Sequence, residues 1–193
     1  MFRLGYQVQE TFDAVGRKKE THFLDKKGYK QGPVYWYYTN GKLKAKGYFK
    51  KDKLNGEYQL YNQEGRVLIF CTYQNGLLHG KYEQFFQDGK KAMEGAFVKG
   101  NKEGYFREYH YGVGSLRAEW KAVRGKRQGK GIWYYPNQKI HFICYFANDK
   151  LEGEYIVYDT IGRILKIQSY QNNLLHGEYI RYHPNGQIAT KAT

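Results

Sequence analysis

The sequence is poor in residues on which several large protein classes depend. Only 3 of its 193 residues are Pro and only 2 are Cys. Serine occurs only at Ser115 and Ser169, and neither lies in the Gly-x-Ser-x-Gly elbow of a seryl nucleophile. No Walker loop, paired-glycine dinucleotide fingerprint or HExxH motif is found, and no apolar run reaches the roughly 18 residues of a membrane span. We therefore expect no enzymatic activity, no cofactor and no bound metal.

Glycine, in contrast, is abundant and regularly spaced. Seven anchor glycines follow one another at intervals of 24 residues, with a single interval of 25: Gly32, Gly56, Gly80, Gly104, Gly129, Gly153 and Gly177. A second glycine follows nine residues later at Gly41, Gly65, Gly89, Gly162 and Gly186, whereas the fourth copy has Gly114 and the fifth has Gln138. The similar phrases NGLLHG (75–80) and NNLLHG (172–177) are the same junction in two copies. The chain is built from repeats.

One copy, residues 56–79, shows what each repeat forms. Two segments rich in β-formers, 57–61 and 67–73, are joined by NQEG, which predicts a β-hairpin. The aromatic positions two and five residues after the anchor should lie on opposite faces unless a bulge intervenes. No helix is expected. A hairpin alone is marginally stable, so the copies must stack. The predicted fold class is all-β, an elongated single-layer antiparallel β-meander of stacked hairpins.

The segments 37–58, 125–137 and 175–186 resemble MORN repeats, and more closely the bacterial variant of that repeat. The resemblance covers about residues 28–193, which we interpret as one continuous array of seven copies. Residues 1–27 resemble a degenerate N-terminal copy that would cap the array. The resemblance implies a non-catalytic binding protein, and the variant family includes antitoxin or immunity proteins. It therefore implies a protein that neutralises a toxin or effector.

The cysteines and the N-terminal residues indicate the cellular compartment in which the protein is expected. Cys71 and Cys144 lie three copies apart, so they should be about 29 Å from each other and unable to form a disulfide. Two free thiols favour a reducing compartment, most simply the cytoplasm. The first residues lack the pattern of an export leader, although a leader removed earlier would leave the same sequence.

Positive charge is the strongest functional signal. The formal net charge is +14, and it is concentrated in two blocks. The first basic block consists of Lys42, Lys44, Lys46, Lys50, Lys51 and Lys53; the second consists of Arg107, Arg117, Lys121, Arg124, Lys126 and Arg127. Such blocks attract acidic proteins, anionic lipid surfaces or nucleic acid backbones, unless they are simply solvated.

Aromatic residues that depart from the repeat consensus complete the candidate site. Trp, Tyr and Arg contribute most of the binding energy at many interfaces. The predicted partner-binding residues are Trp36, Tyr38, Lys50, Lys51, Lys53, Phe86, Arg107, Trp120, Arg124, Lys126, Arg127, Trp133 and Tyr135.

The leading hypothesis is a binding protein for an acidic toxin or effector, and the alternative is a scaffold on anionic membrane lipids. Nucleic acid is less favoured, because the aromatics fit the repeat too regularly to suggest stacking platforms for bases. The last strand, near residues 188–193, could also pair with a partner strand or join two copies edge to edge.

Overall fold

The computed structural model describes residues 5–193, and these contain nineteen β-strands and no helix. They divide into two compact units, which meet within β9 (Lys91–Val98). Unit 1 holds the described residues up to Lys91 together with Phe97–Asn101, and unit 2 holds Ala92–Ala96 and Lys102–Thr193. The expectations for residues 1–4, at the start of the predicted cap, lie outside the described residues.

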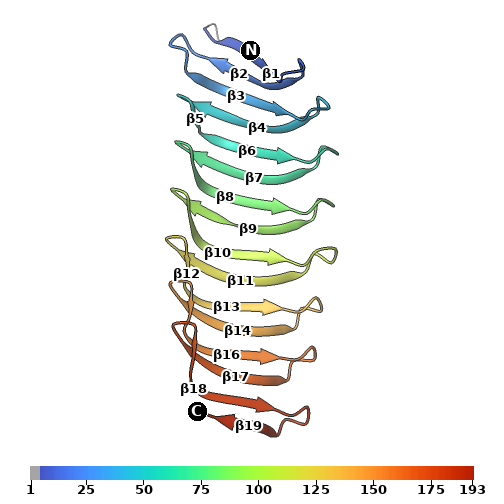
Figure 1. Cartoon of the computed structure of the whole chain (residues 1–193), viewed down its shortest axis with the longest axis vertical. Helices are drawn as coiled ribbons and strands as arrows, with labels where there is room; N and C mark the ends of the chain where they lie inside the picture. The colour runs from blue at the N-terminus through green and yellow to red at the C-terminus, as the bar shows by residue number, and fades with distance from the viewer. Residues whose placement is uncertain (1–4) are drawn as a thin grey trace. The chain divides into compact units, whose positions relative to one another are not determined.

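In unit 1 the strands pair antiparallel with their neighbours along the chain, and β4 pairs with both the short β5 and β6 (Figure 1). The strands β5 and β6 follow one another opposite β4, so together they act as one interrupted strand. The strands of unit 1 are β1 (Gln7–Phe12), β2 (Lys18–Leu24), β3 (Lys30–Tyr37), β4 (Leu43–Lys50), β5 (Lys53–Leu54), β6 (Gly56–Tyr61), β7 (Val67–Gln74) and β8 (Leu77–Phe85).

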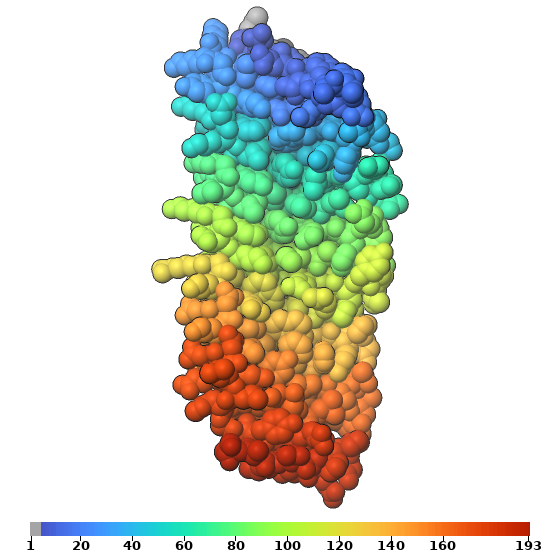
Figure 2. Space-filling model, in the orientation of Figure 1, coloured from blue at the N-terminus to red at the C-terminus, as the bar shows by residue number. Residues whose placement is uncertain are grey.

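Unit 2 repeats this antiparallel arrangement, and in it β11 pairs with both β12 and β13, and β14 with both β15 and β16. Its strands are β10 (Asn101–Tyr109), β11 (Leu116–Val123), β12 (Lys126–Arg127), β13 (Gly129–Tyr134), β14 (Ile140–Ala147), β15 (Lys150–Leu151), β16 (Gly153–Tyr158), β17 (Ile164–Gln171), β18 (Leu174–Tyr182) and β19 (Ile188–Ala192). Within each unit the colour bands of Figure 2 follow the chain, because each hairpin contacts its sequence neighbours. The predicted all-β meander of stacked antiparallel hairpins is confirmed in both units.

Backbone conformation explains the glycine period. All seven anchor glycines have positive φ, between 76° at Gly129 and 116° at Gly56, a region that L side chains rarely adopt. The second position of each copy needs the same conformation, and Gln138 adopts it with φ 66° in the copy that lacks the glycine. The turn geometry is therefore kept even where the sequence signal is lost.

A β-bulge recurs near position five in six copies. In unit 2, Trp133 pairs with Phe142 but Tyr134 pairs with Ile140, so the second strand contributes one extra residue. The bulge leaves the first strand regular, and positions two and five do lie on opposite faces. Tyr61 and Tyr109, at position five, donate hydroxyl hydrogen bonds to the side chains of Gln59 and Glu94, which lie on the face opposite Tyr58 and Phe106.

Unit 2 consequently has two chemically different faces. The aromatic face carries Phe106, Trp120, Trp133, Phe142, Phe146, Tyr155 and Tyr170. The isoleucine face, on the other side of the same strands, carries Ile132, Ile143, Ile156, Ile167 and Ile180. The buried side chains of unit 2 lie mostly on the aromatic face, where Phe106, Ala118 and Ala122 are completely buried.

Candidate protein-interaction surface

A run of stacked rings forms the centre of the aromatic face. Trp133 stacks on Phe142 with ring centroids 4.7 Å apart, and Phe142 stacks on Tyr155 at 5.1 Å. Cross-strand register causes the stacking, because Phe142 of β14 pairs with Trp133 on one side and with Val157, two residues beyond Tyr155, on the other. All three side chains are only half-buried. The rings therefore present a continuous, partly exposed apolar surface.

A pocket of about 330 Å³ lies over these rings. Trp133, Phe142, Phe146 and Tyr155 line it together with Leu151, and Arg127 and Asp149 are its charged members. Arg127 lies with its guanidinium carbon 4.3 Å from the Phe146 ring centroid and donates from Nε to Asp149 Oδ1 at 3.1 Å. An apolar pocket with a few polar groups at its rim is suited to an apolar side chain of a partner.

Hydrogen bonds from Arg127 stabilise the charged form of Asp149. Its carboxylate accepts a backbone hydrogen bond from Arg127 at 2.9 Å. This bond, followed by the side-chain bond from the same arginine, lowers the pKa of Asp149 below its ordinary value. Arg127 and Asp149 thus form an ion pair at the rim of the pocket, and both side chains remain partly exposed.

The two thiols are poor nucleophiles. Cys71 in unit 1 and Cys144 below the pocket in unit 2 are both free and buried. Burial raises the pKa of Cys71 to about 11 and that of Cys144 to about 12, so both remain protonated near neutral pH. Among residues 5–193, no group of three or more His, Cys, Asp and Glu side chains is placed to hold a metal ion.

The predicted aromatic residues of unit 1 have clear packing contacts. Trp36 donates from Nε1 to Glu20 at 2.9 Å, and its ring lies 5.9 Å from that of Tyr58. Tyr38 donates its hydroxyl to the backbone carbonyl of Tyr61 in the next copy, at 2.6 Å. Phe86 is half-buried in the turn after β8.

In unit 2, Tyr135 and Trp120 also have structural contacts. Tyr135 donates its hydroxyl to the carbonyl of Tyr158 in the next copy, at 2.9 Å, as Tyr38 does in unit 1. Trp120 is only 7% exposed and stacks on Phe106 at 4.9 Å. The Tyr135 bond links neighbouring hairpins, whereas the Trp120 stack lies within the β10–β11 hairpin and leaves little of Trp120 for a partner to reach.

The first basic block remains largely uncompensated. None of its six lysines lies within 4.0 Å of a carboxylate of the described residues. Lys50, Lys51 and Lys53 are exposed together at the turn between β4 and β5. Lys51 has φ 50°, so its backbone is in the left-handed region at the tip of this turn. The turn presents three cations to solvent.

The second basic block is partly neutralised within unit 2. Arg107 pairs with Glu119 at 2.8 Å, Arg117 with Glu108 at 2.8 Å, and Arg127 with Asp149. Arg124 and Lys126 remain exposed at the turn between β11 and β12. The net charge of this block counted from the sequence therefore overstates its positive field.

Only part of the predicted site comes together. In unit 2 the structure places Arg127 and Trp133 at one pocket, with Arg124 and Lys126 on the adjoining turn. Sequence reasoning missed Phe142, Phe146 and Tyr155, which complete that pocket, because they occupy consensus aromatic positions. The signal that could have found them is the alternation at positions 13 and 17 of the copy, which puts Phe142 and Phe146 on one face.

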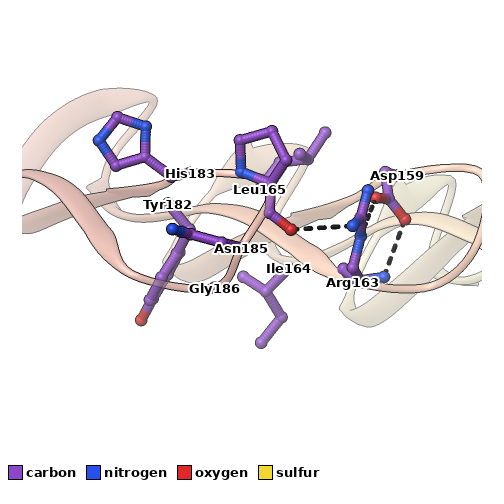
Figure 3. A pocket seen from close by; sticks show the side chains of 9 residues that line it. Asp159, Arg163, Ile164, Leu165, Tyr182, His183, Asn185 and Gly186 are labelled. Atoms are coloured by element: carbon purple, nitrogen blue, oxygen red, sulfur yellow. Dashed lines mark hydrogen bonds and ion pairs between the residues drawn. The ribbon is translucent and has the colours of Figure 1, made fainter.

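A second pocket, of about 350 Å³, lies at the opposite ends of the strands of unit 2, between the turns of its last two hairpins (Figure 3). Arg163 spans it by donating to Asp159 Oδ2 at 2.7 Å and to the carbonyl of Pro184 at 2.8 Å. Its main polar groups are thus used in joining the two turns, so we interpret this pocket as a structural joint.

Comparison with known families agrees with this architecture. Residues 30–51 and 175–193 match the family described as MORN repeat variant. The first match covers β3, β4 and the start of the turn that follows β4, and the second covers all but the first residue of β18 together with β19. The stacked hairpins and these matches together support a MORN-repeat protein.

Other comparisons add no functional information. No curated protein matches the chain. Two similar solved structures are titled "Crystal Structure of TcdB2-TccC3" and "Crystal Structure of TcdB2-TccC3-Cdc42". Both are 12% identical, with TM-scores of 0.22 and 0.23, and they cover 94% and 97% of this chain. The chain spans only 14% of each of those chains, and such TM-scores carry no argument. No helix long and apolar enough to cross a bilayer occurs in residues 5–193.

Proposed function

We propose that this protein is a non-catalytic binding protein that engages a protein partner through the pocket on the aromatic face of unit 2. The observation that carries the proposal is the partly exposed stack of Trp133, Phe142 and Tyr155 beside the Arg127–Asp149 ion pair. Large aromatic side chains bounded by an ion pair are the type of group that concentrates binding energy at interfaces.

The proposed biological role is neutralisation of a toxin or effector, most simply in the cytoplasm. The resemblance to the bacterial MORN variant supports this role, and the exposed cations Arg124 and Lys126 beside the pocket favour an acidic partner. Affinity purification of the full chain from its native cell should recover one partner in stoichiometric amount. Recovery of none at both low and moderate salt would contradict the proposal.

Substitution in the pocket tests where the partner binds. Tyr155→Val places in the pocket a residue that the repeat tolerates, because Val34 occupies the same position of another copy. The matched control is Tyr58→Val, the same change at the same repeat position in unit 1. We expect Tyr155→Val to weaken partner binding by about tenfold or more, as loss of an interface aromatic commonly does, while the control binds normally. Equal affinity for both variants would exclude the pocket.

Attachment to anionic lipid is the second candidate, and a separate observation favours it. Lys50, Lys51 and Lys53 form an exposed turn without ion pairs. If this turn binds lipid headgroups, the chain should cosediment with vesicles containing phosphatidylserine, and changing the three lysines to Gln should abolish cosedimentation. The matched control changes the exposed Lys126, Lys130 and Lys150 of unit 2 to Gln. Equal binding to neutral vesicles would refute this function.

A further inference from the structure

Five isoleucines form an unbroken line across the isoleucine face of unit 2. Ile132 pairs directly with Ile143, and Ile143 pairs with Ile156. Ile156 pairs with Ile167, and Ile167 pairs with Ile180. These pairings join β13, β14, β16, β17 and β18. Directly paired residues share one face of a sheet, so the five side chains form one continuous ladder.

The repeat itself does not require this isoleucine ladder. The corresponding line in unit 1 runs through Tyr35, Lys46, Gln59, Phe70 and Glu83, which pair in the same way. The hairpins of unit 1 therefore form with a mixed polar line where unit 2 has only isoleucine. All five isoleucines are half-buried, so part of each side chain is open to solvent. This apolar strip is a property of the surface of unit 2.

Charged residues flank the ladder in an order that reverses about its centre. Glu119 pairs with Ile132 at one end of the ladder, and Lys191 pairs with Ile180 at the other. On the neighbouring row of the same face, Lys130 lies two residues before Ile132, and Glu178 lies two residues before Ile180. A cation and an anion thus occupy equivalent places on opposite sides of Ile156 in both rows.

From this charge pattern we propose that two copies of the chain associate through their isoleucine faces, with a two-fold axis parallel to the strands at Ile156. The axis reverses the order of the strands, so Ile132 of one copy lies against Ile180 of the second copy and Ile143 against Ile167. The same operation brings Glu119 opposite Lys191 and Lys130 opposite Glu178, so the face is complementary to itself. Self-complementarity is the requirement of an isologous two-fold interface.

The area of the contact between the two isoleucine faces sets the expected strength of dimerisation. Two sheets that pack with aligned strands lie about 10 Å apart, which is suited to interdigitating isoleucines. Five strands spaced about 4.8 Å apart, each contributing about 20 Å of length, give on the order of 500 Å² per copy. The total of about 1,000 Å² is at the lower end for specific interfaces, so we expect a reversible, concentration-dependent dimer.

Some of the flanking charges already have partners within the chain. Glu119 binds Arg107 at 2.8 Å, and Lys191 binds Glu178 at 2.5 Å, with both members of the second pair well exposed. A carboxylate can accept from two donors, so the dimer adds to these pairs. One juxtaposition opposes association: exposed Glu154, two residues before Ile156, must lie opposite Glu154 of the second copy.

Sedimentation equilibrium of the full chain over a wide concentration range tests the proposal. Ile156→Lys should weaken dimerisation at least tenfold, whereas Gln59→Lys, at the same repeat position in unit 1, should leave it unchanged. Glu154→Gln should strengthen it severalfold by removing the like-charge contact. A chain that stays monomeric, or a dimer unaffected by Ile156→Lys, would overturn the proposal. If Ile156→Lys fails to fold, Ile156→Thr provides the same comparison.

Cross-linking gives an independent measurement. Ile156→Cys should yield a covalent dimer with a short bis-maleimide, because the two residues face each other at the axis and the native cysteines are buried. Gln59→Cys should not. A dimer that persists in Ile156→Lys but is lost when Thr190→Pro disrupts β19 would identify edge-to-edge pairing instead and refute the face-to-face arrangement. Neither result depends on the aromatic pocket, so the proposed function is tested separately.

Discussion

Replacement of Gly95 by alanine probes the packing of the aromatic face. Gly95 lies in β9, and a Cβ atom built there would approach three ring atoms of Phe106 to 2.4, 2.5 and 2.7 Å. Phe106 has no exposed surface, and its ring is stacked on the buried Trp120. The ring cannot turn aside without breaking that stack. We therefore expect Gly95→Ala to destabilise the protein by about 1–3 kcal/mol, the usual cost of overpacking a core.

Thermal unfolding followed by circular dichroism measures this cost. For a chain of this size, each kcal/mol corresponds to a decrease in Tm of about 2–4 °C. Phe106→Val supplies the second arm of a double-mutant cycle, because Val34 occupies that repeat position elsewhere. In the Phe106→Val background, Gly95→Ala should cost much less, with a coupling of at least about 1 kcal/mol. An unchanged Tm for Gly95→Ala, or strictly additive effects, would refute the packing argument.

Three further predictions concern hydrogen bonds and ionisation. Tyr135→Phe removes the hydroxyl bond to the Tyr158 carbonyl and should lower the unfolding free energy by about 1 kcal/mol in denaturant titrations, whereas Tyr158→Phe should have a smaller effect. Asn62, which is 5% exposed, accepts hydrogen bonds from the backbone N–H groups of Glu64 and Arg66, so Asn62→Ala should cost about 1–3 kcal/mol and Asn62→Asp less. The folded state keeps the thiol protons of Cys71 and Cys144, whose pKa values burial raises to about 11 and about 12, at a pH where the unfolded chain releases them. The unfolding free energy should therefore fall as the pH rises above the ordinary thiol pKa of 9.0, and a Cys144→Ala variant should show a shallower fall; equal slopes would contradict this origin.

Most of the fold could be predicted from the sequence, because its backbone requirements appear directly in the glycine spacing. Each anchor glycine marks a residue with positive φ, and such positions select glycine strongly. The bulge at position five could not be predicted in this way. It inserts one residue into the second strand, such as His141 opposite the Trp133–Tyr134 step, and no residue type is required there. The division into two units at β9 likewise has no counterpart in the repeat period.

The candidate site was less predictable, because it depends on contacts between copies. Departure from the consensus selected Trp133, which lines the pocket, but it also selected Tyr135, whose hydroxyl joins two hairpins. The charge count likewise could not show that Glu119 and Glu108 neutralise Arg107 and Arg117. To predict any of these contacts, one must know which residues are paired across neighbouring strands, and the bulges shift that register. The structure also places Lys50, Lys51 and Lys53 together around the turn between β4 and β5, where all three are exposed.

The isoleucine ladder combines both kinds of information. Ile132, Ile156 and Ile180 recur every 24 residues, as do Ile143 and Ile167, so each series is visible in the sequence. The register then alternates the two series into a single line. Unit 1 forms the same pairs with Lys46 and Gln59 in that line, so hairpin stacking does not account for five isoleucines in unit 2. Since partly exposed β-branched side chains in an unbroken row also invite non-specific pairing, their occurrence beside oppositely ordered charges is better explained by a defined contact than by stability.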